Sequence, residues 1–155
     1  MTNENIFRNL ISFYTKNAYT DNYIFGFTMA GMVYAVTILG ADDTLPFVMT
    51  LDKASRGQGY SLRFKPNKSQ KAVLLESGKV ESLCSVEYFN ECVENSKYNR
   101  GEIFEKMVTE NLGVEWVKDN VPYTDGGDVE VDGIAYQIKF EKATFTNEKS
   151  MSLMK

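Results

Sequence analysis

The stretch TDGGDVEVDGIAYQIKFEKATF, residues Thr124–Phe145, decides how the second half of this chain folds. Asp132-Gly133 stands between two runs of alternating apolar and polar residues. An Asp-Gly pair suits a type I′ turn, because both central residues of that turn need positive φ. The stretch therefore predicts a β-hairpin, with one strand over Asp128–Val131 and the other over Ile134–Phe140.

Side chains alternate along the second strand of this hairpin, because successive Cβ atoms point to opposite faces of a sheet. Gln137 and Lys139 are expected on one face and Ile138 on the other. Asp128 opens the first strand, so we expect it to meet Gln137 and Lys139 at one end of a small sheet. A carboxylate, an amide oxygen and an ammonium in one place suit a divalent metal ion and a phosphodiester.

The rest of the chain alternates between helical and strand patterns. Helices are predicted over Asn3–Lys16, Ser85–Ser96, Glu102–Asn111 and Thr146–Lys155. Strands are predicted over Tyr23–Met29, Met32–Leu39, Phe47–Leu51, Tyr60–Lys65, Lys71–Glu76, Lys79–Leu83 and Val114–Val117. The fold class is therefore α+β, with a helix and an antiparallel meander over residues 1–97 and an α-β-β-β-α core over residues 98–155.

The predicted core is too short to be stable alone, because domains of about 60 residues bury only a marginal apolar surface. The N-terminal part must therefore pack on this core or extend its sheet, so that the 155 residues form one compact domain. A homodimer is a further way to complete the core.

Composition excludes several kinds of chemistry. The chain has no histidine, which removes His-dependent catalytic triads and nearly all catalytic zinc sites. Cys84 and Cys92 are the only cysteines, so we expect neither a disulfide scaffold nor a structural zinc site. Neither a secretory signal nor a membrane-spanning segment is apparent, and a cytoplasmic protein is expected.

Basic residues are concentrated in one segment, although the formal net charge is −4. Residues 53–71 contain six basic and no acidic residues, whereas the chain from Glu76 onward is mainly acidic. Such a basic arm would hold a polyanion near an acidic metal site, and the alternative is a solvated loop. The candidate nucleic-acid-binding residues are Arg56, Arg63, Lys65, Lys68 and Lys142.

The second half carries an ordered set of polar residues: Gly101-x-x-x-Glu105 on a predicted helix, then Asp128, then Gln137-x-Lys139. This order resembles the PD-(D/E)XK nuclease superfamily, which includes restriction endonucleases and Holliday-junction resolvases. The resemblance covers about residues 100–155. It implies a restriction-endonuclease-like core and hydrolysis of DNA phosphodiester bonds, in duplex or branched DNA, in a phage or mobile-element context.

The resemblance also implies a role for each residue, with Mg²⁺ or Mn²⁺ as the cofactor. Asp128 would be the primary metal ligand, Gln137 and the backbone carbonyl of Ile138 would be further ligands, and Glu105 would bind directly or through water. Lys139 would orient the attacking water or offset developing negative charge.

Several alternatives remain open at the level of sequence. Glu102 competes with Glu105 for the helical position, and Glu130 is a weaker candidate on the face of Asp128. Gln137 replaces the commoner carboxylate, which should weaken metal binding. The chain is therefore an active nuclease, an inactive relative that binds a protein partner, or a small interaction module with a chance arrangement of these residues.

Overall fold

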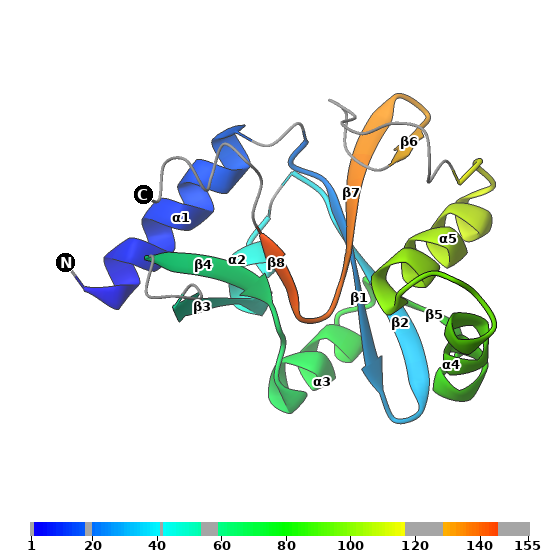
Figure 1. Ribbon diagram of the computed structural model, residues 1–155. Helices are drawn as coiled ribbons and strands as arrows, with labels where there is room; N and C mark the ends of the chain where they lie inside the picture. Colours follow the sequence, from blue (N-terminus) through cyan, green and yellow to red (C-terminus); the bar gives the residue numbers. More distant parts are fainter. Residues whose placement is uncertain (1, 18–19, 41, 54–58, 117–128, 146–155) are drawn as a thin grey trace.

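The computed structural model describes residues 2–17, 20–40, 42–53, 59–116 and 129–145. Helices and strands both occur along these residues, which confirms the α+β class (Figure 1). None of the helices described is both long enough and apolar enough to cross a bilayer. The elements are α1 (Asn3–Asn17), β1 (Tyr23–Met29), β2 (Met32–Ile38), α2 (Thr44–Val48), β3 (Met49–Lys53), β4 (Tyr60–Phe64), α3 (Lys68–Glu76), β5 (Val80–Ser85), α4 (Val86–Glu94), α5 (Arg100–Leu112), β6 (Val129–Val131), β7 (Ile134–Phe140) and β8 (Ala143–Phe145).

Two sheets organise the fold. The larger sheet has five strands in the order β5-β2-β1-β7-β6, and the smaller has three in the order β3-β4-β8. Strand β7 runs parallel to β1, whereas the other strand pairs are antiparallel. The N-terminal strands thus divide between two sheets, and the prediction of one continuous antiparallel meander is wrong.

The predicted hairpin is confirmed over the residues described. Strands β6 and β7 pair in the register Val129↔Tyr136 and Val131↔Ile134. The turn between them has φ of 52° at Asp132 and 81° at Gly133, as a turn with two left-handed residues requires.

Two apolar clusters lie on opposite faces of the five-stranded sheet. One contains Tyr23, Phe25 and Phe27 of β1 and is covered by α1, α2, α3 and the three-stranded sheet. The other contains Ile24 of β1 and Ile138 of β7 and is covered by α4 and α5. Figure 1 shows these two groups of elements on either side of the large sheet.

Gly26 lets α5 approach the sheet closely. A methyl group at this position would overlap the ring of Phe104, which is fully buried. Strand β1 directs large aromatic side chains toward one face of the sheet. On the other face Gly26 has no side chain, and the Phe104 ring occupies the space that this leaves.

The prediction of a strand over Lys71–Glu76 is wrong, because these residues belong to helix α3. The helix begins with a capping box: the Asn67 side chain accepts a hydrogen bond from the Gln70 N–H, and the Gln70 side chain accepts one from the Asn67 N–H. This reciprocal pair satisfies two backbone donors at the start of the helix. Its stabilising effect outweighs the lower helix propensity of the β-branched residue within the helix.

Two other predicted strands need correction. The segment Val114–Trp116 is not a strand, because the Val114 N–H returns to the carbonyl of Thr109 at the end of α5 and Trp116 packs edge-on against Tyr98. The predicted strand Phe47–Leu51 is half helix: α2 holds Pro46 in its first turn, where a missing N–H is tolerated, and β3 begins at Met49.

The remaining predictions of helices and strands hold where they can be compared. Ser85 caps α4 by accepting a hydrogen bond from the Tyr88 N–H, and Gly113 ends α5 with φ of 75°. The final helix predicted over Thr146–Lys155 lies outside the residues described. Strand β8, which was not expected, pairs with β4 through Phe64↔Ala143.

Candidate functional site

Gln137 and Lys139 project from the same face of β7, as the alternation predicts. In the parallel register, Gln137 lies beside Tyr23 and Lys139 lies beside Phe25. Side chains of paired residues share a face, so the amide and the ammonium stand on the face of the cluster that contains Tyr23 and Phe25. Both polar side chains are half-buried.

Strand β7 is fixed at both of its ends. At its beginning, the Thr20 hydroxyl donates to the carbonyl of Ala135 at 2.6 Å, and the N–H of Gln137 donates to the carbonyl of Asn22 at 3.0 Å. At its end, the N–H of Glu141 donates to the carbonyl of Gly26 at 2.7 Å. A strand held in this way presents its side chains with little positional freedom, which a catalytic or binding site needs.

The aromatic neighbour of Gln137 is electrically neutral at ordinary pH. Burial, and then the nearby charge of Asp21, raise the pKa of Tyr23 to about 12. The Tyr23 hydroxyl therefore keeps its proton at neutral pH.

Asp128 lies outside the residues described. Val129, which follows it in the chain, pairs with Tyr136, which precedes Gln137. In the part of the chain that the structure describes, no three Asp, Glu or Cys side chains gather closely enough to hold a metal ion. The proposed metal site at β7 thus depends on a carboxylate from outside the residues described, and Asp128 is the one that the sequence predicts.

The donor groups on β7 fit a hard divalent cation. Gln137 offers an amide oxygen and Ile138 a backbone carbonyl, and oxygen atoms of these kinds are the ligands that Mg²⁺ accepts alongside one or two carboxylates. The Ile138 side chain is buried in the cluster covered by α4 and α5, so it does not belong to the face that carries Gln137 and Lys139.

Glu105 comes from the helix on the other side of the sheet. Helix α5 buries Ile103, Phe104 and Val108 against the face that carries Ile138, whereas Gln137 and Lys139 are on the opposite face. Glu105 is half-buried on this helix. The structure thus brings Gln137 and Lys139 together and places Glu105 on an element that covers the reverse face.

Glu102, the competing acid on α5, has a structural role. Its carboxylate accepts a hydrogen bond from the N–H of Asn99 at 3.1 Å, and the Asn99 side chain accepts one from the N–H of Glu102 at 2.9 Å. The Glu102 carboxylate thus belongs to the capping box at the start of α5.

Three of the candidate nucleic-acid-binding residues gather where β4 meets the end of β7. The Arg63 guanidinium donates to the carbonyl of Lys142 at 2.9 Å and lies 3.6 Å from the Asp52 carboxylate. Lys142 is exposed, and its N–H donates to the carbonyl of Phe64. Lys65 is the next residue after Phe64, so its backbone lies near that of Lys142.

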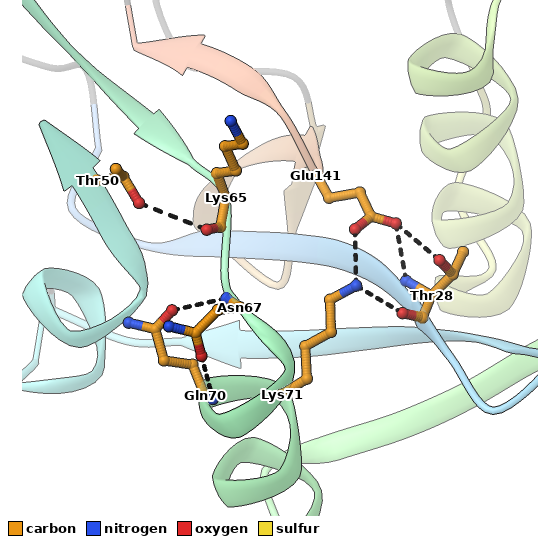
Figure 2. Close-up of polar contacts among 7 residues, drawn as sticks. All are labelled: Thr28, Thr50, Lys65, Asn67, Gln70, Lys71 and Glu141. Carbon is orange, nitrogen blue, oxygen red and sulfur yellow. Dashed lines mark hydrogen bonds and ion pairs between the residues drawn. The ribbon is translucent and has the colours of Figure 1, made fainter. Parts of the chain in front are cut away.

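The other two candidates are placed differently. Lys68 is exposed at the first residue of α3, and Arg56 lies outside the residues described. The carbonyl of Lys65 accepts a hydrogen bond from the Thr50 hydroxyl at 3.4 Å, which joins β3 to β4 (Figure 2).

A polar cluster around Glu141 was missed from the sequence. The Lys71 ammonium lies 2.9 Å from the Glu141 carboxylate and 2.7 Å from the carbonyl of Thr28. The Thr28 N–H and hydroxyl both donate to the other carboxylate oxygen, at 3.1 and 2.8 Å (Figure 2). Extending the alternation of Gln137 and Lys139 by two residues gives Glu141, and this signal would have found it.

The environment of Glu141 keeps its carboxyl ionised. Burial by itself would raise the pKa of this group, but the hydrogen bonds from Lys71 and Thr28 and the charge of Lys71 outweigh burial and lower the pKa. The cluster holds α3, β1 and the end of β7 together.

No protein-family model, curated protein or solved structure matches this chain.

Proposed function

We propose that this protein is a metal-dependent nuclease that hydrolyses DNA phosphodiester bonds, with a PD-(D/E)XK-like site on β6 and β7. The observation that carries the proposal is the pairing of Gln137 and Lys139 on one face of a strand inside a five-stranded sheet. An amide oxygen and an ammonium two residues apart on a fixed strand suit a metal ion and a phosphate in adjacent positions.

Each residue of the proposed site has a distinct task. Asp128, the Gln137 amide oxygen and the Ile138 carbonyl would hold Mg²⁺ or Mn²⁺, which supplies Lewis acidity and lowers the pKa of bound water. Lys139 would donate hydrogen bonds to the attacking water or to a phosphoryl oxygen, so that negative charge developing there is stabilised. Glu105 would need to reach around the edge of the sheet to contribute.

The basic residues Arg63, Lys65 and Lys142, in and next to β4 and the end of β7, support a path for a DNA backbone. Lys139 lies beside Phe25, and the ring of Phe25 stacks on the ring of Phe64 at 4.2 Å between centroids. Phe64 stands between Arg63 and Lys65 in the chain, and Lys142 is the second residue after β7. Phosphates flanking the scissile bond would meet these cations, because backbone neutralisation dominates non-specific binding of DNA.

The proposal is tested by incubating the full chain with plasmid and branched DNA in the presence of Mg²⁺ or Mn²⁺. We expect cleavage by the wild-type protein, and its loss in Asp128→Ala and Lys139→Ala with unchanged thermal unfolding. Lys79→Ala is a matched control, because Lys79 lies beside Asp42, 3.2 Å from its carboxylate. A folded wild-type protein that neither cleaves DNA nor binds either metal in calorimetry would refute the nuclease.

A second candidate function is a catalytically inactive relative that binds a protein partner. The observation in its favour is that α5, with Glu105, covers the face of the sheet opposite to Gln137 and Lys139. The net charge of −4 also suits a basic protein partner better than DNA. Absence of metal binding by the folded wild-type protein would favour this function over the nuclease.

A further inference from the structure

A pocket of about 550 Å³ lies between β5, α4 and α5, on the side of the sheet away from Gln137 and Lys139. Both cysteines of the chain line it: Cys84 comes from β5 and Cys92 from α4. Met107 of α5 lines the pocket as well. Three sulfur-bearing side chains from three different elements therefore line one cavity at the margin of the apolar cluster beneath α4 and α5, and the proposed nuclease site does not use them.

The spacing of two of these sulfur atoms suits a shared ion. Cys84 Sγ lies 3.7 Å from Met107 Sδ. Three sulfur atoms arranged in a plane around one ion, at bonds of about 2.3 Å, lie roughly 4.0 Å apart. The Cys84–Met107 pair is within a few tenths of an ångström of this spacing, so ligation would require little movement of β5 against α5.

Cys92 is the third sulfur atom in the pocket. It lies on α4, one helical turn after Tyr88, and both residues line the pocket that Cys84 and Met107 line from the neighbouring elements. Tyr88 therefore stands next to a proposed ligand, where outer contacts that orient metal ligands are found.

We propose that Cys84, Cys92 and Met107 form a binding site for one soft monovalent cation, of which Cu(I) is the biological example. Two thiols and a thioether select soft ions, since thioether sulfur is a poor ligand for Mg²⁺, Ca²⁺ or Zn²⁺. Structural zinc needs four strong ligands, and this chain offers two cysteines and no histidine.

The charges around the pocket fit such an ion. Binding breaks the S–H bonds of Cys84 and Cys92, releases both protons to solvent and leaves a Cu(I)–dithiolate group with a net charge of −1. The Lys106 ammonium lines the same pocket and interacts with Cys92, while pairing with the Glu110 carboxylate at 3.0 Å. Lys106 can therefore turn toward the bound group and compensate its charge.

Anaerobic titration of the full chain with Cu(I), against a chromophoric chelator that competes for it, tests the site. We expect one equivalent bound by the wild-type protein. Cys84→Ser and Cys92→Ser should each weaken the binding at least about a hundredfold, and Met107→Leu about tenfold. Met29→Leu is the matched control, because Met29 packs against the cluster on the other face of the sheet.

Two further readouts separate a built site from adventitious binding. Cu(I) should raise the melting temperature of the wild-type protein and leave that of Cys84→Ser/Cys92→Ser unchanged, because a ligand stabilises only the state that binds it. Binding of Cu(I) should also release two protons into weakly buffered solution, because both thiols must lose their protons to ligate the ion. Equal Cu(I) binding by the wild-type protein and the double variant, or no binding by the wild-type protein, would overturn the proposal. If Cys84→Ser does not fold, the affinities of Cys92→Ser and Met107→Leu for Cu(I) test the proposal instead.

Discussion

The Lys71 ammonium lies 2.9 Å from the Glu141 carboxylate and fastens helix α3 to the residue that follows β7. Both side chains are largely buried, with exposed fractions of 16% and 11%. Thr28 of β1 binds both partners, so one cluster joins three elements that are far apart in the sequence. The strand that carries Gln137 and Lys139 depends on this anchor for the position of its end.

Removing the charge of Glu141 should destabilise the fold. Glu141→Gln leaves the buried Lys71 ammonium without its counter-charge, and we expect the free energy of unfolding to fall by about 2–3 kcal/mol. Urea denaturation at pH 7 measures the change. Glu4→Gln breaks an exposed ion pair with Arg8 and should change stability by less than about 0.5 kcal/mol. Equal effects of the two variants would contradict the role given to Glu141.

The same carboxylate predicts a pH dependence of stability. Its pKa is lower in the folded chain than in the unfolded chain, so its stabilisation is present above the unfolded value of about 4.3 and is lost as the pH falls through the folded value. The difference in unfolding free energy between the wild-type protein and Glu141→Gln should therefore shrink as the pH is lowered from 5 to 3. A difference that stays constant over this range would show that ionisation of Glu141 contributes nothing.

A methyl group at Gly26 should separate α5 from the sheet. Gly26→Ala places a carbon inside the volume of the Phe104 ring, and we expect a loss of about 1–3 kcal/mol in denaturation experiments. Gly101→Ala is the matched control, because its added carbon meets the Asn99 side chain at an ordinary distance of 3.5 Å and alanine favours a helix. Adding Phe104→Leu to Gly26→Ala should cost less than the sum of the two single changes, since the smaller side chain relieves the overlap.

Restoring a carboxylate on β7 should strengthen metal binding. Gln137→Glu adds one negative charge beside Asp128 in the sequence-predicted site, and we expect the affinity for Mn²⁺ measured by calorimetry to rise about tenfold. Gln137→Leu removes the oxygen ligand and should lower the affinity. If all three proteins bind Mn²⁺ equally, Gln137 is not a ligand.

The basic residues near the end of β7 should set the salt dependence of DNA binding. Lys65→Gln and Lys142→Gln should each reduce the slope of log K against log salt concentration by about 0.9 for duplex DNA. Both side chains are exposed, so the fold should tolerate the changes, whereas Arg63 is tied to Lys142 and Asp52. Lys79→Gln should leave the slope unchanged. An equal change in all three variants would show that Lys65 and Lys142 do not contact the DNA backbone.

Local patterns in the sequence predicted the hairpin around Asp132-Gly133 and the start of α4 at Ser85. These features depend on neighbouring residues: positive φ in a two-residue turn, or a side-chain oxygen that accepts a backbone N–H. Helix α3 is equally local, and its capping box Asn67-x-x-Gln70 is visible in the sequence. The strand prediction there is wrong because it follows from the apolar residues of the segment and leaves out the capping box that precedes them.

Contacts between distant segments could not be predicted in this way. Nothing near Tyr23 specifies that it will lie beside Gln137, or that Lys71 will meet Glu141. Such pairs follow from how whole faces pack, which depends on side-chain volumes from many elements, as the fit of Phe104 over Gly26 illustrates. For the candidate site, the sequence predicted the shared face of Gln137 and Lys139, whereas the side of the sheet taken by α5 emerged only in three dimensions.

The parallel pairing of β1 with β7 has a consequence for how the chain is made. More than a hundred residues separate Tyr23 from Gln137, so the central pair of the large sheet forms only after the residues up to β7 have left the ribosome. Until then one edge of β1 is an open hydrogen-bonding template, which invites pairing with other chains. Contacts of this sequence separation also slow folding, because a long loop must close before any interaction rewards it. Synthesis of this protein therefore passes through a stage in which β1, five of whose seven residues are buried in the fold, is paired along one edge only until β7 has been made.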